Sequence, residues 1–160
     1  MTARWQADET QQLLLEELNH RVKNMLTVIL SIAAQTRSEA SSLDVFADTF
    51  EQRVEVLAQA HDALTRNGWK GASLCDLVRS SVGLFSNAQQ GRITFAGPSV
   101  ALGPNVATTL SLALHELCTN ALKYGALSTE KGRVEIAWRV EDMPSGRRLT
   151  FDWGERGGPA

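Results

Sequence analysis

The chain has 160 residues, of which 43% are apolar and 21% are charged, and its formal net charge is −2. This composition supports one folded domain or two small ones and excludes a disordered chain. No basic run or basic face with aromatic residues indicates nucleic-acid binding, and no apolar stretch approaches the ~18 residues of a membrane-spanning helix. The start of the chain has no signal-peptide pattern, and Cys75 and Cys118 predict two buried free thiols in a reducing, cytoplasmic compartment.

The first part of the chain, about residues 9–66, predicts an antiparallel hairpin of two amphipathic helices. The first helix, about 9–36, carries an apolar stripe of Leu14, Leu18, Val22, Met25, Ile29 and Ile32. The stripe of the second helix consists of Phe46, Phe50, Val54, Leu57 and Leu64. We expect Asp44 to be the N-cap of the second helix, and Asn67-Gly68 to end it. Since the hairpin cannot bury both stripes, a second hairpin in a four-helix bundle, or the following domain, is expected to cover the rest.

The second part predicts alternating helices and strands. The expected helices cover about 73–85 and 104–124, and the expected strands 92–95, 134–140 and 149–153. Val134, Ile136 and Trp138 alternate with charged or small residues, which is typical of a strand with one buried face. The pattern therefore predicts an α+β sandwich with its helices on one face of the sheet.

One histidine of the first helix faces away from the apolar stripe. At 100° per residue, His20 falls on the polar side together with Glu17 and Asn24. A neutral imidazole is a nucleophile at neutral pH, because its pKa is near ~6.5. Asn24 is placed to orient a phosphoryl group or water, and the flanking Arg21 and Lys23 to attract phosphate oxygens. The alternative is an ordinary solvated helix face on which the histidine is incidental.

The helix expected over 104–124 has a polar face suited to a magnesium nucleotide. Its predicted core stripe contains Leu110, Leu114, Leu117 and Ala121. Glu116, Asn120 and Lys123 lie on the opposite side, with Tyr124 at the edge, whereas the role of the neighbouring His115 is not decided by periodicity. A carboxamide oxygen suits Mg²⁺, a carboxylate can act as a base, and a lysine offsets phosphate charge. A solvated polar face is again the alternative.

Three blocks of the sequence resemble those of the HWE histidine kinases. The segment HELCTNALKYGALS (115–128) is similar to the N box of that family, WGERGGP (153–159) to its W-x-E block, and LNHRVKN (18–24) to its phospho-acceptor box. The resemblance implies a protein histidine kinase of two-component signalling. It also implies a dimerisation and histidine-phosphotransfer hairpin (9–66), followed by the first part of a Bergerat-type ATP-binding α/β sandwich (69–160).

The resemblance further implies the cofactors ATP and Mg²⁺ and a role for each residue of the helical face. His20 would accept the γ-phosphoryl group, Asn120 would bind Mg²⁺, and Glu116 would be its acidic neighbour and activate His20. Lys123 and Tyr124 would border the phosphates and the nucleotide. The expected partners are a second copy of the chain and the receiver domain of a response regulator, whose aspartate takes the phosphoryl group.

The W-x-E block implies the other end of the nucleotide site. Glu155 would accept a hydrogen bond from the adenine amino group, and Gly157 would permit close approach of the base. Arg21 departs from the pattern of many histidine kinases, which carry an acid directly after the phospho-acceptor, so the base stays open, with Glu17 as a candidate.

The chain ends at Ala160, before the ATP lid and second glycine-rich motif of the family, which predicts a truncated catalytic core. Two other readings of the sequence are open. One is a histidine phosphotransfer protein or scaffold whose second domain is degenerate and does not bind ATP. The other is an ATPase or protein serine kinase on the same fold.

Overall fold

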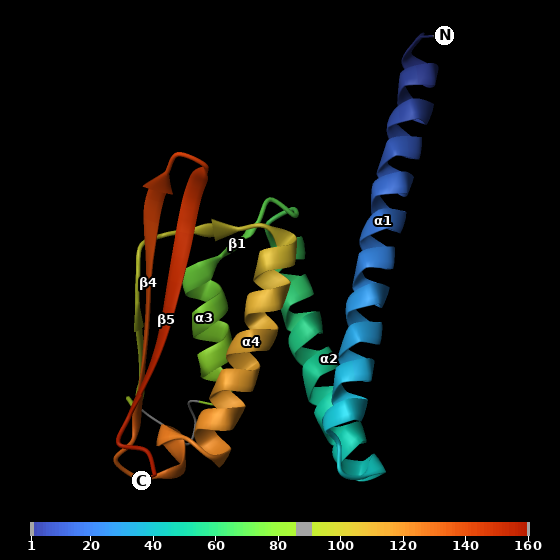
Figure 1. Cartoon of the computed structure of the whole chain (residues 1–160). Coiled ribbons are helices and arrows are strands. Elements are labelled where there is room, and N and C mark those ends of the chain that lie inside the picture. Colours follow the sequence, from blue (N-terminus) through green and yellow to red (C-terminus); the bar gives the residue numbers. More distant parts are fainter. Residues whose placement is uncertain (1, 86–90, 160) are drawn as a thin grey trace. The chain divides into compact units, whose positions relative to one another are not determined.

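The structure, a computed structural model, describes residues 2–85 and 91–159 (Figure 1). It consists of two compact units, which divide between Val54 and Glu55 inside the second helix. Ala160, the last residue of the expected ATP-binding domain, lies outside the described residues. Within the described ranges, none of the helices has both the length and the apolar character needed to cross a lipid bilayer.

The first unit contains helix α1 (Thr2–Glu39) and the first half of helix α2 (Leu43–Arg66). Helix α1 begins seven residues before the expected start at residue 9, since residues 2–8 contain no glycine or proline that would stop a helix. The prediction that Asp44 is the N-cap of α2 was wrong. The Ser42 Oγ accepts from the Val45 N–H at 3.2 Å, and Asp44 lies in the first turn, where its charge favours the helix dipole.

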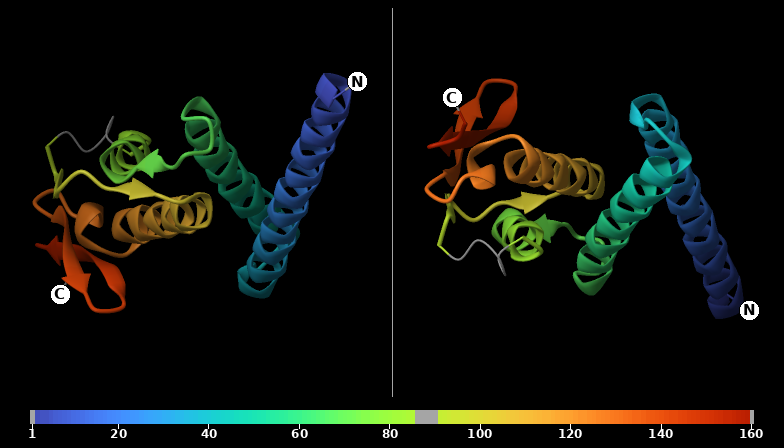
Figure 2. Two further views of the ribbon diagram at one scale, coloured as in Figure 1. Left: turned by 90° about the horizontal axis from the view of Figure 1, so that it is seen from above. Right: turned by 90° about the horizontal axis from the view of Figure 1, so that it is seen from below.

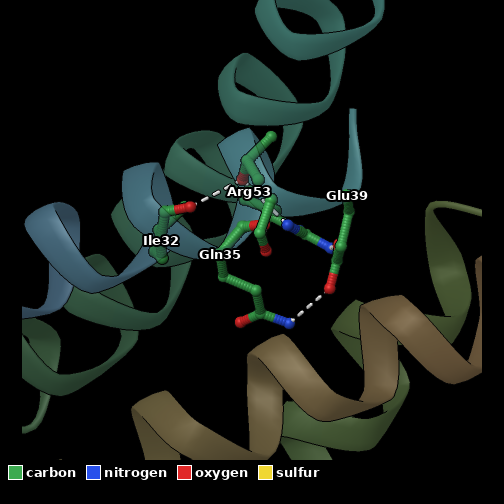
Figure 3. Close-up of polar contacts among 6 residues, drawn as sticks. Ile32, Gln35, Glu39 and Arg53 are labelled. Atoms are coloured by element: carbon green, nitrogen blue, oxygen red, sulfur yellow. Dashed lines mark hydrogen bonds and ion pairs between the residues drawn. The ribbon is translucent and has the colours of Figure 1, made fainter. Parts of the chain in front are cut away.

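A buried arginine joins the two helices near their connection (Figure 3). Arg53 is 5% exposed, and its guanidinium donates to the Thr36 Oγ1 and to the Glu39 Oε2, each at 2.8 Å. The Thr36 hydroxyl donates in turn to the Ile32 carbonyl at 2.6 Å, and the Gln35 amide donates to Glu39 at 3.0 Å. The hydrogen bonds from Arg53 and Gln35 hold the pKa of Glu39 below its usual value, because they stabilise the carboxylate.

The apolar stripe of α1 is covered only toward the end of the helix. Ile32 is 6% exposed, whereas Leu14, Leu18 and Val22 are 60%, 61% and 49% exposed. The prediction that the hairpin leaves part of its stripes uncovered is therefore confirmed for the first half of α1.

The second unit has an α+β architecture, as predicted. After α2 follow β1 (Ala72–Ser73), α3 (Leu74–Gly83), β2 (Ile93–Ala96), β3 (Ala101–Leu102), α4 (Pro104–Lys123), the 3₁₀ helix η2 (Ala126–Ser128), β4 (Arg133–Met143) and β5 (Gly146–Arg156). Strand β4 is central: it pairs in parallel with β2 and antiparallel with β5. Strands β1 and β3 form a separate antiparallel pair. Figures 1 and 2 show α3 and α4 side by side on one side of the sheet.

The buried face of the sheet supports the core of this unit. Val134, Ile136 and Trp138 of β4 are at most 4% exposed and alternate with exposed residues, as expected. Strands β4 and β5 are longer than predicted, because their ends pair with each other beyond the apolar part. Helix α3 is capped by the Ser73 hydroxyl, which accepts from the Asp76 N–H, and it buries the predicted Leu74, Leu77, Val78 and Val82.

Candidate active site

Helix α4 presents opposite faces to the core and to the outside. Its buried residues are Ala107, Ser111, Leu114, Cys118 and Ala121. The predicted stripe was right for Leu114 and Ala121, but Leu110 and Leu117 are only half-buried, because the helix packs through a line of smaller side chains. Burial raises the pKa of the Cys118 thiol to about 12, so this thiol is neutral at physiological pH.

The predicted polar set lies on the outer face of α4. Asn120 and Lys123 are exposed, Glu116 is half-buried one turn before Asn120, and Tyr124 at the helix end is 75% exposed. In the described parts of the chain, no three His, Cys, Asp or Glu side chains gather to hold a metal ion. The Asn120 carboxamide still fits Mg²⁺, because this ion takes oxygen ligands and keeps several waters while it binds substrate phosphates.

The end of β5 meets the chain directly after α4. The Glu155 Oε2 accepts from the Ala126 N–H at 2.7 Å, and its Oε1 accepts from the Trp153 indole N–H at 3.0 Å. A Cβ on Gly125 would collide with the Glu155 carboxylate, so glycine is required for this approach. The structure thus brings together the last turn of the predicted N box and the predicted W-x-E block.

A second set of contacts fixes the loop that follows α4. The Arg92 Nε donates to the Gly132 carbonyl at 2.8 Å, and its Nη2 donates to the carbonyls of Thr129 and, at 3.4 Å, Ala126. The Thr129 hydroxyl donates to the Gly157 carbonyl at 2.7 Å. Sequence reasoning missed Arg92, and no pattern would have revealed it, because its acceptors are backbone carbonyls. The hydrogen bond between Trp153 and Glu155 was also missed, although two residues at i and i+2 of a strand share a face.

His20 lies in the first unit and is exposed on α1, as predicted. The Asn24 Nδ2 lies 3.4 Å from the His20 Nδ1, so an Asn24 that donates there selects the tautomer with its proton on Nε2. Glu17, one turn before, accepts a hydrogen bond from the Arg21 guanidinium, with which it forms an ion pair. Asn24 therefore does lie beside His20, whereas Glu17 is engaged by the neighbouring cation.

A hollow of about 620 Å³ lies elsewhere in the second unit, between the end of α2, helix α3 and helix α4. Ser111 and His115 line it from α4, but Glu116, Asn120 and Lys123 do not. The His115 ring is half-buried, with its centroid 5.6 Å from that of Phe85. His115 is thus part of a different surface from the predicted nucleotide face.

A helical unit with an exposed histidine is followed by an α+β unit whose polar helix meets a glutamate-bearing strand, which is the arrangement expected of a histidine kinase. The chain belongs to the HWE histidine kinase family, whose model matches residues 17–99. It is 37% identical to a blue-light-activated histidine kinase of Brucella anthropi, over all of this chain and 33% of that protein. It is 40% identical to blue-light-activated histidine kinase 1 of Erythrobacter litoralis, over 94% of this chain and 41% of that protein.

The fold agrees with this assignment. The solved structure of the Erythrobacter litoralis EL346 blue-light activated histidine kinase superimposes with a TM-score of 0.55 at 20% identity, over 88% of this chain and 45% of that one. The chain covers 33% and 41% of the length of the two curated relatives above.

Proposed function

We propose that this chain carries the catalytic core of a histidine kinase, which uses Mg-ATP to phosphorylate His20 and passes the phosphoryl group to a response-regulator aspartate. The observation that carries the proposal is that the polar outer face of α4 ends next to the contact between Glu155 and the Ala126 N–H. Asn120 and Lys123 lie at the end of the helix from which the chain turns directly into the Glu155–Ala126 contact. A carboxamide suited to a metal ion and an ammonium suited to phosphate are therefore followed by a carboxylate suited to the amino group of adenine.

Each residue has a defined role in this proposal. Asn120 would hold Mg²⁺, and Lys123 and Tyr124 would border the phosphates and the nucleotide. Glu155 would accept from the adenine amino group through a lone pair that its two internal donors leave available, since a carboxylate has about four acceptor sites. Gly157 would lie against the base. Bound ATP supplies the γ-phosphoryl group, and Mg²⁺ offsets its charge.

The tautomer of His20 determines what else the reaction needs. With Asn24 donating to Nδ1, the proton is on Nε2. A base would take this proton as Nε2 forms its bond to the γ-phosphorus, while the bond from that phosphorus to the bridging oxygen breaks and ADP leaves. Glu17 accepts a hydrogen bond from the Arg21 guanidinium and forms an ion pair with it, so its carboxylate is already engaged within α1. We accordingly assign the base role to Glu116 and keep Asn24 as the group that orients the ring.

The experiment uses ATP labelled at the γ-phosphate. We expect an acid-labile label on the wild-type chain and none on His20→Ala; label that persists in this variant would exclude His20 as acceptor. Asn120→Asp is expected to lower labelling at least tenfold, while Asn105→Asp, an exposed asparagine in the first turn of the same helix, is the matched control.

A phosphorylated receiver domain, used as donor in the reverse direction, separates the two steps. Asn120→Asp should accept phosphate on His20 from the receiver at the wild-type rate. A chain that takes label only from the receiver, and never from ATP, would instead be a phosphotransfer protein.

We also propose that the chain acts as a homodimer through α1. The exposed stripe of Leu14, Leu18 and Val22 continues into the buried Ile32, so one apolar line is covered at one end and open at the other. Two such hairpins packed together would cover it in a four-helix bundle. Light scattering should give a dimer for the wild type and a monomer for Leu18→Glu, whereas Glu16→Lys, at an exposed polar position, should leave the mass unchanged.

A further inference from the structure

On the face of β5 that is turned toward the core, the last side chain is the carboxylate of Glu155. Side chains alternate along a strand, so Leu149, Phe151, Trp153 and Glu155 share one face. The register places Trp153 opposite the buried Ile136 and Glu155 opposite the buried Val134. Glu155 thus stands where an apolar face stops, and the tryptophan two residues earlier is its neighbour on that face.

Both oxygens of this carboxylate are held by the chain itself. The Ala126 N–H holds Oε2 from the loop after α4, and the Trp153 indole holds Oε1 from the same strand. A glutamate has three side-chain torsions, and two donors from different directions select one arrangement of them. The carboxylate is therefore oriented before any ligand arrives, although the residue is exposed.

We propose that Trp153 is a positioning residue, whose indole N–H aims the Glu155 carboxylate so that its remaining lone pairs select adenine over guanine. The inference rests on the nucleotide role proposed above for Glu155. A fixed carboxylate accepts from the amino group that adenine carries at position 6, and it repels the oxygen that guanine carries there. A carboxylate that turns freely can rotate away from that oxygen, so loss of the indole N–H weakens the selection.

The test compares Trp153→Phe with Trp138→Phe, a matched control. The Trp138 indole also donates one hydrogen bond, to the Pro98 carbonyl at 2.8 Å, but it lies on β4 away from Glu155. The first readout needs no nucleotide: hydrogen exchange of the Ala126 amide, followed by NMR. Trp153→Phe should accelerate this exchange about fivefold, the effect of weakening one hydrogen bond, whereas Trp138→Phe should not. Equal exchange in the two variants would overturn the positioning role.

The second readout is the ratio of the dissociation constants of ATP and GTP. Trp153→Phe should narrow the preference for ATP about tenfold, and Trp138→Phe should preserve it even where the variant is less stable. An unchanged ratio in Trp153→Phe, together with an altered ratio in Glu155→Ala, would refute the inference and leave the role of Glu155 intact. An unchanged ratio of dissociation constants in Glu155→Ala, or no binding of either nucleotide to the wild type, would contradict the proposed nucleotide role of Glu155 and the selection of adenine with it. The exchange measurement would still decide whether Trp153 orients Glu155.

Discussion

Replacing Arg92 should destabilise the second unit more than replacing other arginines that lie on its surface. The half-buried guanidinium reaches three carbonyls of the 126–132 loop, two of them through the same Nη2. Counting two independent charged hydrogen bonds at about 1.5 kcal/mol each gives a loss of about 3 kcal/mol for Arg92→Ala. Arg92→Lys can keep one of the two and should lose about half as much.

Urea unfolding followed by tryptophan fluorescence measures this loss, because Trp69, Trp138 and Trp153 all lie in the second unit. The control is Arg79→Ala, which breaks an exposed ion pair with Asp76 and should cost less than about 0.5 kcal/mol. If Arg92→Ala unfolds at the same urea concentration as Arg79→Ala, the three carbonyl contacts do not hold the loop, and the reasoning fails.

Three further predictions concern charge, reactivity and packing. The pKa of Glu39 in the folded chain lies below its ordinary value of 4.5, so its carboxylate should stabilise the folded state fully above pH 4.5 and lose this effect as pH falls through the folded pKa. Unfolding of the wild type and of Glu39→Gln across this pH range measures the effect, which the variant should lack. Iodoacetamide should modify the half-buried Cys75 well before the buried Cys118, whose raised pKa disfavours the thiolate, and mass spectrometry of timed samples would contradict this if Cys118 reacted first. Leu114→Ala should cost about 3 kcal/mol in urea unfolding, because the side chain is 0% exposed, whereas Leu84→Ala, at a position 53% exposed, should cost under about 1 kcal/mol; equal losses would refute the burial argument.

The helices and long strands of the second unit were predictable because their signals are local. Pro104 at the first turn and the small, flexible Gly125 after the last turn bound α4, and the observed helix ends one residue before the predicted one. Ser73 marks the start of α3 in the sequence, because its hydroxyl caps the helix. The alternation in β4 is visible in sequence because one of its faces is buried and the other exposed.

Other features depend on partners that are distant in the chain. Strands β1 and β3 have two residues each, too few for any periodicity, and form only because residues 72–73 pair with 101–102. The acceptors of Arg92 lie 34, 37 and 40 residues further along, and all are backbone carbonyls, so no side-chain pattern marks them. Ser42 and Asp44 are both good capping residues, so capping propensity alone does not show that Ser42 is the residue that caps α2.

The local structure also determines which substitutions can report on chemistry. Gly157 was predicted to admit the adenine base, but its φ of 71° favours glycine there in any case, because a side chain is strained in this backbone conformation. An activity loss in Gly157→Ala would therefore mix backbone strain with nucleotide contact. Asn120 and Lys123 are exposed, and their side chains make no hydrogen bond or ion pair with the residues that the structure describes. Their substitution should leave folding almost unchanged, so a loss of phosphorylation in these two variants can be assigned to the reaction.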